Sequence, residues 1–189
     1  MNVHPLGGGV FTITDFLSDD ECSRYIALSE AMGYEEASMG PAGREVIFKE
    51  HRNNDRIVFD RADIAQELFE KARASLPAEL DGWRLSGFNE RMRFYRYDQQ
   101  QYFKWHRDGT FRRSDQEESF LTFMMYLNDG FEGGDTQFQW DSVKPQRGMA
   151  LVFPHRLSHQ GSPVISGVKY VLRTDVMYSS PAPVQPAGG

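Results

Sequence analysis

His106 and Asp108 stand two residues apart in the segment KWHRDGTF, residues 104–111, with aromatic residues on both sides. On an extended segment, residues i and i+2 project from the same face, so an imidazole nitrogen and a carboxylate oxygen can reach one cation. The pair alone is a weak signal, because this composition would produce a His-x-Asp by accident about one time in three. A metal site therefore needs a third ligand from elsewhere in the chain.

Two further histidines, His155 and His159 in FPHRLSHQGSP, follow an apolar segment and precede a turn. Together with His106 and Asp108, either one would complete a set of two histidines and one carboxylate. Such a set leaves three adjacent positions open on an octahedral iron(II). Position alone favours neither histidine, and either could instead be a polar residue at a strand end.

Two basic residues, Lys169 and Arg173, interrupt the apolar segment GVKYVLRTDVMY, residues 167–178. Strand alternation places both on one face with Val171 and Asp175. A cation inside a β-body must be paired or hydrogen-bonded, and a co-substrate with a carboxylate would pair it. The alternative is that this face is solvated, or that Asp175 or another acidic residue pairs with one of the cations.

The elements that must position these residues differ between the two halves of the chain. A short strand is expected over residues 10–16 and another over 56–60. Two helices are expected, one beginning at the capping-box pair Ser18 and Glu21 and ending near Gly33, the other over residues 61–76, before Pro77. From residue 83 onward, short β-like segments separated by turn signals predict a sandwich or barrel. These segments are residues 91–97, 119–127, 136–140, 148–153 and 168–178.

The composition is that of one globular domain. The net charge of −6 argues against a nucleic-acid partner, and it gives no support for binding an anionic membrane. A single cysteine excludes an internal disulfide and a multi-cysteine metal site. With no long apolar stretch and no secretion signal in the sequence, we expect a cytoplasmic protein that does not span a membrane. The tail, residues 179–189, is expected to be disordered, and the sequence leaves the oligomeric state open.

The segment from Tyr97 to Tyr178 resembles the iron(II)- and 2-oxoglutarate-dependent dioxygenases, specifically their prolyl 4-hydroxylase-like branch. YDQQQYFKWHRD is similar to the family's tyrosine, spacer, aromatic and His-x-Asp segment, although the usual glycine of the spacer is absent. LTFMMYLNDGFEGGDTQF resembles its strand ending in Tyr-Leu-Asn, followed by Gly-Gly-acid-Thr-x-Phe. In the last part of the family pattern, a basic residue follows the distal histidine by ten positions. This spacing joins His159 to Lys169, whereas His155 would point to Ile165.

The resemblance implies a mainly β (α+β) fold, a double-stranded β-helix or jelly roll with the N-terminal helices packed on the outside. A single domain would span residues 1–178, with a helical part over 1–82 and the jelly-roll core over 83–178. Iron(II) would be bound by His106, Asp108 and His159. The co-substrates would be oxygen and 2-oxoglutarate, and the family also allows ascorbate as a reductant. The candidate 2-oxoglutarate contacts are Lys169, which is favoured, with Arg173, Tyr97 and Tyr126.

The implied activity is hydroxylation of an unactivated C–H bond in a peptide or protein prolyl residue or in a small metabolite, with release of succinate and CO2. The polar segment KEHRNNDR, residues 49–56, could line the pocket opening, or it could be a solvated loop. Its candidate substrate contacts are Arg52, Asn53, Asn54 and Arg56. Two other functions stay open: a cupin-like metal-dependent enzyme that does not use 2-oxoglutarate, and a non-catalytic jelly-roll binding module.

Overall fold

The computed structural model describes residues 1–37 and 50–181, and its centre is a large antiparallel sheet. Its strands are β1 (Asn2–Gly7), β2 (Val10–Thr14), β3 (Glu35–Glu36), β4 (Asp55–Asp60), β5 (Glu79–Leu80), β6 (Trp83–Phe88), β7 (Arg91–Tyr97), β9 (Arg112–Ser114), β10 (Glu117–Tyr126), β14 (Ala150–Pro154) and β17 (Lys169–Ser179). The main path runs β1-β2-β14-β10-β17-β7-β4-β3, so the long strands β10 and β17 lie at its centre.

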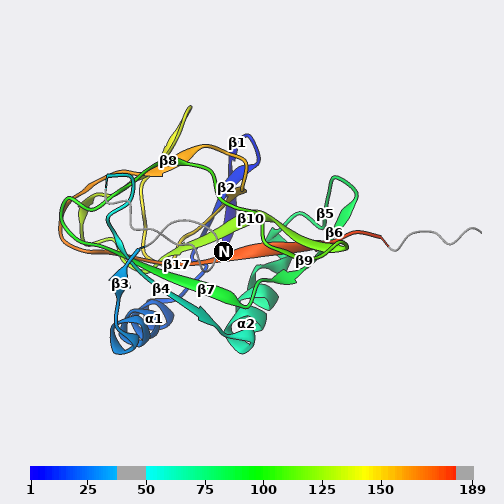
Figure 1. The fold of residues 1–189 in the computed structure, drawn as a ribbon, viewed down its shortest axis with the longest axis horizontal. Coiled ribbons are helices and arrows are strands. Elements are labelled where there is room, and N and C mark those ends of the chain that lie inside the picture. The colour runs from blue at the N-terminus through cyan, green and yellow to red at the C-terminus, as the bar shows by residue number, and fades with distance from the viewer. Residues whose placement is uncertain (38–49, 182–189) are drawn as a thin grey trace, which may run out of the picture.

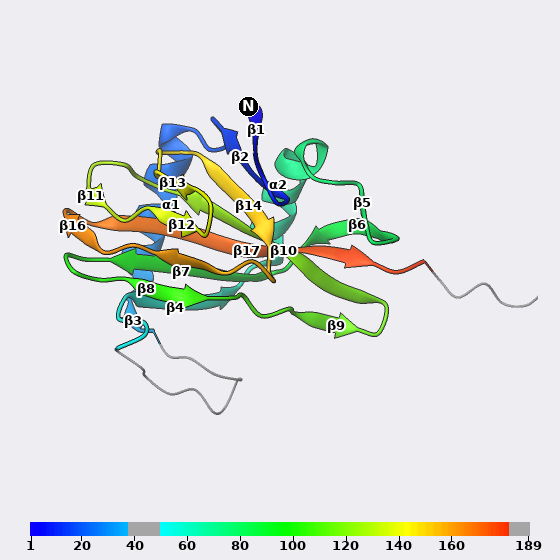
Figure 2. The same ribbon diagram turned by 90° about the horizontal axis from the view of Figure 1, so that it is seen from above.

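A smaller sheet faces the large one. It contains β8 (Phe103–His106), β12 (Thr136–Phe138), β13 (Ser142–Val143) and β15 (His159–Gly161), in the order β13-β12-β15-β8. A further pair joins β11 (Glu132–Gly133) to β16 (Val164–Ser166). Figures 1 and 2 show the small sheet on one side of the large sheet and the helices on the other. The predicted jelly roll with external helices is therefore confirmed.

Both predicted helices form, and α1 begins at the predicted capping box, whereas α2 has no side-chain N-cap hydrogen bond. In α1 (Asp19–Met32), the backbone N–H of Glu21 donates to Ser18 Oγ at 3.2 Å, while the Glu21 carboxylate accepts from the Ser18 N–H at 2.7 Å. The second helix, α2 (Ala62–Ala72), tightens into a 3-10 turn, η1 (Arg73–Ser75), before Pro77. Lys71 of α2 contacts the carboxylate of Glu21 at 2.7 Å, which ties the two helices together.

The large sheet is buried on both faces, so its central strands read as continuous apolar runs. On β10, Phe123 and Met125 pack with the helices in one hydrophobic cluster. Met124 and Tyr126 project from the opposite face into a second cluster with residues of the small sheet. Alternation on β17 follows the prediction, since Leu172 joins the helix-side cluster and Val171 the other one.

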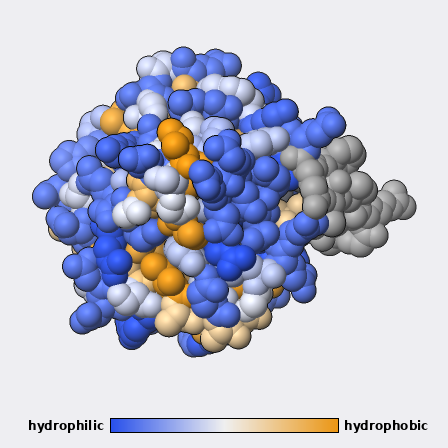
Figure 3. Space-filling model, turned by 90° about the vertical axis from the view of Figure 1, so that its left-hand side faces the viewer, coloured by the Kyte–Doolittle hydropathy of each residue, from blue (hydrophilic) through white to orange (hydrophobic). Residues whose placement is uncertain are grey.

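The N-terminal part contributes more than helices. Strands β1 to β4 all join the large sheet, and β2 pairs with β14 along the register Ile13–Ala150. Neither helix in the described residues has the length and apolar character needed to cross a membrane. The face seen in Figure 3 is mainly hydrophilic and is crossed by a narrow band of apolar residues. Of the predicted disordered tail, residues 182–189 lie outside the described residues.

Candidate active site

The three candidate metal ligands meet between β8 and β15. These strands pair antiparallel, and His106 lies directly opposite His159. Asp108 follows the end of β8, and one ligand atom from each residue lies within 4.8 Å of the others. The His106 Nε2 is 3.6 Å from Asp108 Oδ1, and the His159 Nε2 is 3.7 Å from Asp108 Oδ2. The structure thus brings together the His106, Asp108 and His159 predicted as ligands.

Both histidines are oriented by the same local hydrogen bond. The Nδ1 of His106 lies 2.7 Å from the Lys104 carbonyl, and the Nδ1 of His159 lies 3.0 Å from the Leu157 carbonyl. A carbonyl only accepts, so each Nδ1 carries the proton and each Nε2 keeps its lone pair for a metal. Burial lowers the pKa of His159 to about 4, which keeps this imidazole neutral, as a metal ligand must be.

Asp108 is held by a hydroxyl, a guanidinium and the backbone. Thr122 Oγ1 donates to its Oδ2 at 2.5 Å, and Arg173 Nη1 lies 3.0 Å from its Oδ1. Its backbone N–H donates to the His155 carbonyl at 3.0 Å. Burial by itself raises the pKa of Asp108, but the charge of Arg173 and the two histidines hold the pKa well below its usual value. The carboxylate is therefore ionised and fixed in orientation.

His155, the other histidine considered as a ligand, has both ring nitrogens engaged. Its Nε2 lies 2.8 Å from Ser119 Oγ, and its Nδ1 lies 3.0 Å from Thr122 Oγ1. It is buried and supports the hydroxyl that orients Asp108. The choice of His159 as the third ligand is consistent with this geometry.

A pocket extends from the three ligands into the space between the two sheets, with about 400 Å³ of empty volume, part of it open to solvent. Lys169 lies on its wall with 3 % exposure, and its Nζ donates to the Gly134 carbonyl at 2.5 Å. The ammonium also faces the rings of Tyr97 and Tyr126, at 5.1 Å and 5.4 Å. No ion pair joins Lys169 to an acidic residue within the described ranges. Burial accordingly lowers the pKa of Lys169 to about 7.

The other candidate cation, Arg173, lies on the same face of β17 but has different partners. It contacts Asp108 at 3.0 Å and Asp175 at 3.1 Å, and Arg93 approaches Asp175 at 3.2 Å. Two arginines and two aspartates therefore form one buried network beside the metal ligands. The sequence raised a pairing of Arg173 with Asp175 as an alternative to co-substrate binding, and this ion pair is present.

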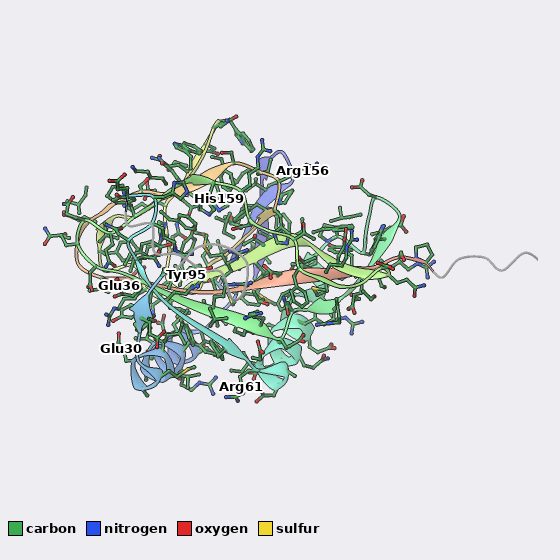
Figure 4. The ribbon with its side chains drawn as sticks, in the orientation of Figure 1. Glu30, Glu36, Arg61, Tyr95, Arg156 and His159 are labelled. Atoms are coloured by element: carbon green, nitrogen blue, oxygen red, sulfur yellow. The ribbon has the colours of Figure 1, made fainter. Side chains whose placement is uncertain are left out.

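Two tyrosines were predicted as co-substrate contacts. Tyr97 lines the pocket. Tyr126 is fully buried, and its hydroxyl donates to Thr136 Oγ1 at 2.7 Å, while its ring lies against the Lys169 ammonium. Sequence reasoning missed Tyr95, which also lines the pocket two residues before Tyr97. The alternation of RMRFYRY places both tyrosines on one face and could have identified it. Figure 4 shows Tyr95 and His159 inside the body, between the two sheets, with Arg61 and Arg156 at its periphery.

The four predicted substrate residues have different environments. Arg52 is buried, with its Nε donating to Asn54 Oδ1 at 2.7 Å, and its guanidinium lies over the rings of Tyr95 and Phe103. Asn54 is also buried and donates to the Asp55 carbonyl. Asn53 accepts from the Tyr102 N–H at 2.7 Å, a contact that fixes the loop. Arg56 lies within β4. Of the four, Arg52 is in contact with rings that line the pocket.

Comparison with known proteins identifies one matching family. Residues 92–174 match the 2OG-Fe(II) oxygenase superfamily, a segment that contains all three ligands and both pocket cations of β17. No curated protein matches the chain.

Solved structures of the same fold include several prolyl hydroxylases. A viral collagen prolyl hydroxylase from Paramecium Bursaria Chlorella virus-1, solved with 2OG, has a TM-score of 0.63 and 23% identity, covering 92% of this chain and 97% of its own. A Pseudomonas putida prolyl-4-hydroxylase has a TM-score of 0.62 and 20% identity, over 92% of this chain and 93% of its own. A Trichoplax adhaerens prolyl hydroxylase, solved with a hypoxia inducible factor peptide fragment, has a TM-score of 0.66 and 16% identity. The match covers 89% of this chain and 83% of its own. At these identities the likeness establishes the fold.

Proposed function

We propose that this chain, whose residues 92–174 match the 2OG-Fe(II) oxygenase superfamily, hydroxylates an unactivated C–H bond of a prolyl residue or of a small metabolite. One oxygen atom of O2 enters the substrate as hydroxyl, and the other enters succinate as 2-oxoglutarate loses CO2. The observation that carries the proposal is the convergence of His106, Asp108 and His159 beside a buried Lys169 that forms no ion pair with any acidic residue in the described part of the chain.

The protein's own residues hold, orient and shield the reacting groups. Bound iron(II), together with 2-oxoglutarate and oxygen, supplies the oxidising chemistry. His106 and His159 would present Nε2 to the metal, because each Nδ1–H already donates to a backbone carbonyl. With Asp108 they make three protein ligands, so three coordination positions are left for the co-substrates. The aromatic walls at Phe103 and Phe153 keep the pocket largely apolar.

Lys169 is the residue proposed to receive the distal carboxylate of 2-oxoglutarate. Its ammonium is desolvated and has no ion pair to a described acid, so a bound carboxylate would gain a charge-assisted hydrogen bond. Arg173, the other candidate, already contacts both Asp108 and Asp175. It is therefore better placed to hold the metal ligand than to anchor the far end of the co-substrate. Tyr97 and Tyr126 lie against Lys169 and complete its surroundings.

The two other functions fit these residues less well. A cupin-like enzyme that does not use 2-oxoglutarate would leave Lys169 buried without an anion, unless its substrate supplied one. A binding module would give no reason for the two matched Nδ1 hydrogen bonds that aim both imidazoles at Asp108. Prolyl hydroxylases among the structural neighbours, one of them solved with a peptide fragment, support a prolyl residue as a candidate substrate.

The test begins with the protein, iron(II) and 2-oxoglutarate in the absence of oxygen. We expect a weak visible charge-transfer band, followed by slow succinate formation when oxygen is admitted, with ascorbate present and absent as a variable. Metal uptake without the band would favour the cupin-like alternative. Failure to bind metal at all would favour the binding module.

Asp108→Ala should lower succinate formation by at least about a thousandfold, because it removes one of three metal ligands. The fold should persist, since Arg173 keeps Asp175 as a partner. Asp115→Ala, at an exposed aspartate, is the control and should behave as the wild type. Wild-type succinate formation in Asp108→Ala would refute the metal-site assignment.

A further inference from the structure

The charged groups around the pocket do not balance. Asp108 and Asp175 are matched by Arg173 and Arg93 in the buried network. Lys169 and Arg52 are 3 % and 4 % exposed, and neither forms an ion pair with an acid in residues 1–37 and 50–181. Asp135 acts on Lys169 from beyond ion-pairing distance. Two buried cations are thus left over.

Loading the site with its cofactors does not remove this excess. Iron(II) brings two positive charges and 2-oxoglutarate brings two negative charges, so together they add no net charge. The net excess of two positive charges therefore persists in the loaded pocket, even though the distal carboxylate of 2-oxoglutarate would pair with Lys169. Uncompensated charge in a desolvated site is costly, and an anionic group on the primary substrate would offset part of that cost.

Arg52 lies close enough for its charge to act on a substrate at the metal. Its Cζ is 4.4 Å from the centre of the Phe103 ring, and that ring stacks on His106 at 3.4 Å. The guanidinium is therefore within about 8 Å of a metal-ligand ring. At that distance inside a protein, a full charge has a substantial effect on the binding of another charge.

Tyr95 lies between Arg52 and Arg173. The Arg52 Cζ is 4.7 Å above the Tyr95 ring, and Arg173 Nη1 lies 3.3 Å from the Tyr95 hydroxyl. Arg52 Nη2 and Arg173 Nε are both buried without a hydrogen-bond partner in the described structure. Buried donors are nearly always satisfied in native proteins, so the unpartnered Nε of Arg173, a residue that lines the pocket, indicates a missing acceptor there.

We propose that the primary substrate carries a carboxylate. This carboxylate binds beside Tyr95, where the positive charges of Arg173 and Arg52 attract it. Tyr95 and Arg173 line the pocket, while Arg52 acts by its charge from behind the rings of Tyr95 and Phe103. The substrate class is then a free amino or imino acid, or the C-terminal residue of a peptide, in place of a residue inside a polypeptide. This inference rests on the proposed hydroxylase function.

The first experiment compares matched acids and amides. The probes are L-proline and the other common amino acids, each with its amide, and glycyl dipeptides with a free or amidated C-terminus. The readout is CO2 release from 2-oxoglutarate above the substrate-free rate. At least one free acid should exceed its amide about tenfold in kcat/KM. A panel in which no free acid outperforms its amide overturns the proposal.

The second experiment removes the charge behind Tyr95. Arg52→Gln should raise the KM of the preferred acid about tenfold and leave its amide unchanged. Arg52→Lys should recover part of the preference, because it keeps the charge without the planar guanidinium. Arg156→Gln, at an exposed arginine that does not line the pocket, is the control and should change the kinetics of neither substrate.

Two readouts separate this inference from the proposed function. Succinate formed without substrate, together with the charge-transfer band, tests the oxygenase itself. If wild-type protein lacks both, the proposed function fails. If Arg52→Gln weakens 2-oxoglutarate binding, or affects acid and amide equally, the carboxylate site is refuted while the oxygenase assignment stands.

Discussion

Thr122 connects a metal ligand to a chain of hydrogen bonds whose direction is fixed. Ionised Asp108 can only accept, so the Thr122 hydroxyl must donate to it. The hydroxyl then accepts from the Nδ1–H of His155, whose Nε2 accepts in turn from Ser119. The Phe111 N–H completes the chain by donating to Ser119 Oγ. Every hydroxyl and ring nitrogen in the chain therefore has a defined role, and the carboxylate cannot rotate without breaking several bonds.

Residue types and spacing predicted the ligands but not these supports. The His-x-Asp pair and the ten-residue spacing from His159 to Lys169 can be read from the sequence alone. The role of His155 depends on Ser119 and Thr122, which lie 36 and 33 positions away. The stack of Arg52 on Phe103 depends on a β-bridge between residues that are still farther apart in the chain. Such contacts have no local pattern, so only the folded chain shows them.

The buried ammonium of Lys169 should lower the free energy of unfolding, although the same group provides a binding site. Its pKa is about 7 in the fold against a usual value near 10.5, so between these pH values the unfolded chain binds the additional proton. The stability of the wild type therefore rises with pH across this window. Lys169→Met should be more stable than the metal-free wild type by about 1–3 kcal/mol at pH 6, with the difference shrinking toward pH 10. The same variant should lose 2-oxoglutarate binding.

Urea unfolding at several pH values checks this expectation, with the charge-transfer band as the measure of co-substrate binding. Lys144→Met, at an exposed lysine, serves as the control and should change neither property. A Lys169→Met variant that is less stable at pH 6 would mean that the hydrogen bond to Gly134 outweighs the desolvation of the ammonium.

At the scale of elements, the turn between β11 and β12 positions Lys169. Gly134 has a φ of 69° and accepts from the Lys169 ammonium through its carbonyl. A Cβ at this position would lie 3.0 Å from the Phe131 ring and 3.2 Å from the Lys169 side chain. Gly134→Ala should therefore lower stability by about 1–3 kcal/mol and raise the KM for 2-oxoglutarate several-fold.

The control for this turn is Gly87→Ala in β6, where an added Cβ would meet no atom within 4 Å. Thermal unfolding and 2-oxoglutarate titration of both variants provide the comparison. An unchanged KM in Gly134→Ala would show that Lys169 is positioned by β17 alone.

The sequence best predicted the elements that have a recognisable pattern of capping or apolar residues within their own length. The first helix has a capping box, the second has regularly spaced apolar residues, and β10 and β17 are long apolar runs. The strands β8, β12 and β15 that carry or flank the metal ligands are only three or four residues long. A run of that length has no measurable period, so their pairing is determined by the fold as a whole. The N-terminal strand β1 was missed for a different reason, because it forms an exposed hairpin with β2.

At the scale of the whole molecule, the site joins two sheets. His106 and His159 belong to the small sheet, while Lys169 and Arg173 belong to the large one. A ligand that contacts both sheets binds only the folded chain, so it should stabilise the entire domain. With anaerobic iron(II) and 2-oxoglutarate each at 100 times its dissociation constant, each ligand should contribute about 2.7 kcal/mol, so the total gain should be about 5 kcal/mol, or roughly 10–20 °C in Tm.

Differential scanning calorimetry measures this shift, and a chelator should reverse it. Asp108→Ala should show no shift with the same additions, because it lacks one ligand. A shift of equal size in that variant would place the metal or the co-substrate somewhere other than between the two sheets.

The rise of one strand also sets a length limit. Lys169 and Arg173 are four residues apart on β17, so their Cα atoms are separated by about 13 Å. Backbone pairing with β7 and β10 on either side makes this separation rigid. If one end of a keto-diacid is chelated near Asp108 and the other reaches Lys169, a homologue shortened by one methylene can satisfy one end only. A longer homologue must buckle. The protein would then select dicarboxylates by their carbon number because the strand cannot stretch or shorten, and it would need no separate specificity loop.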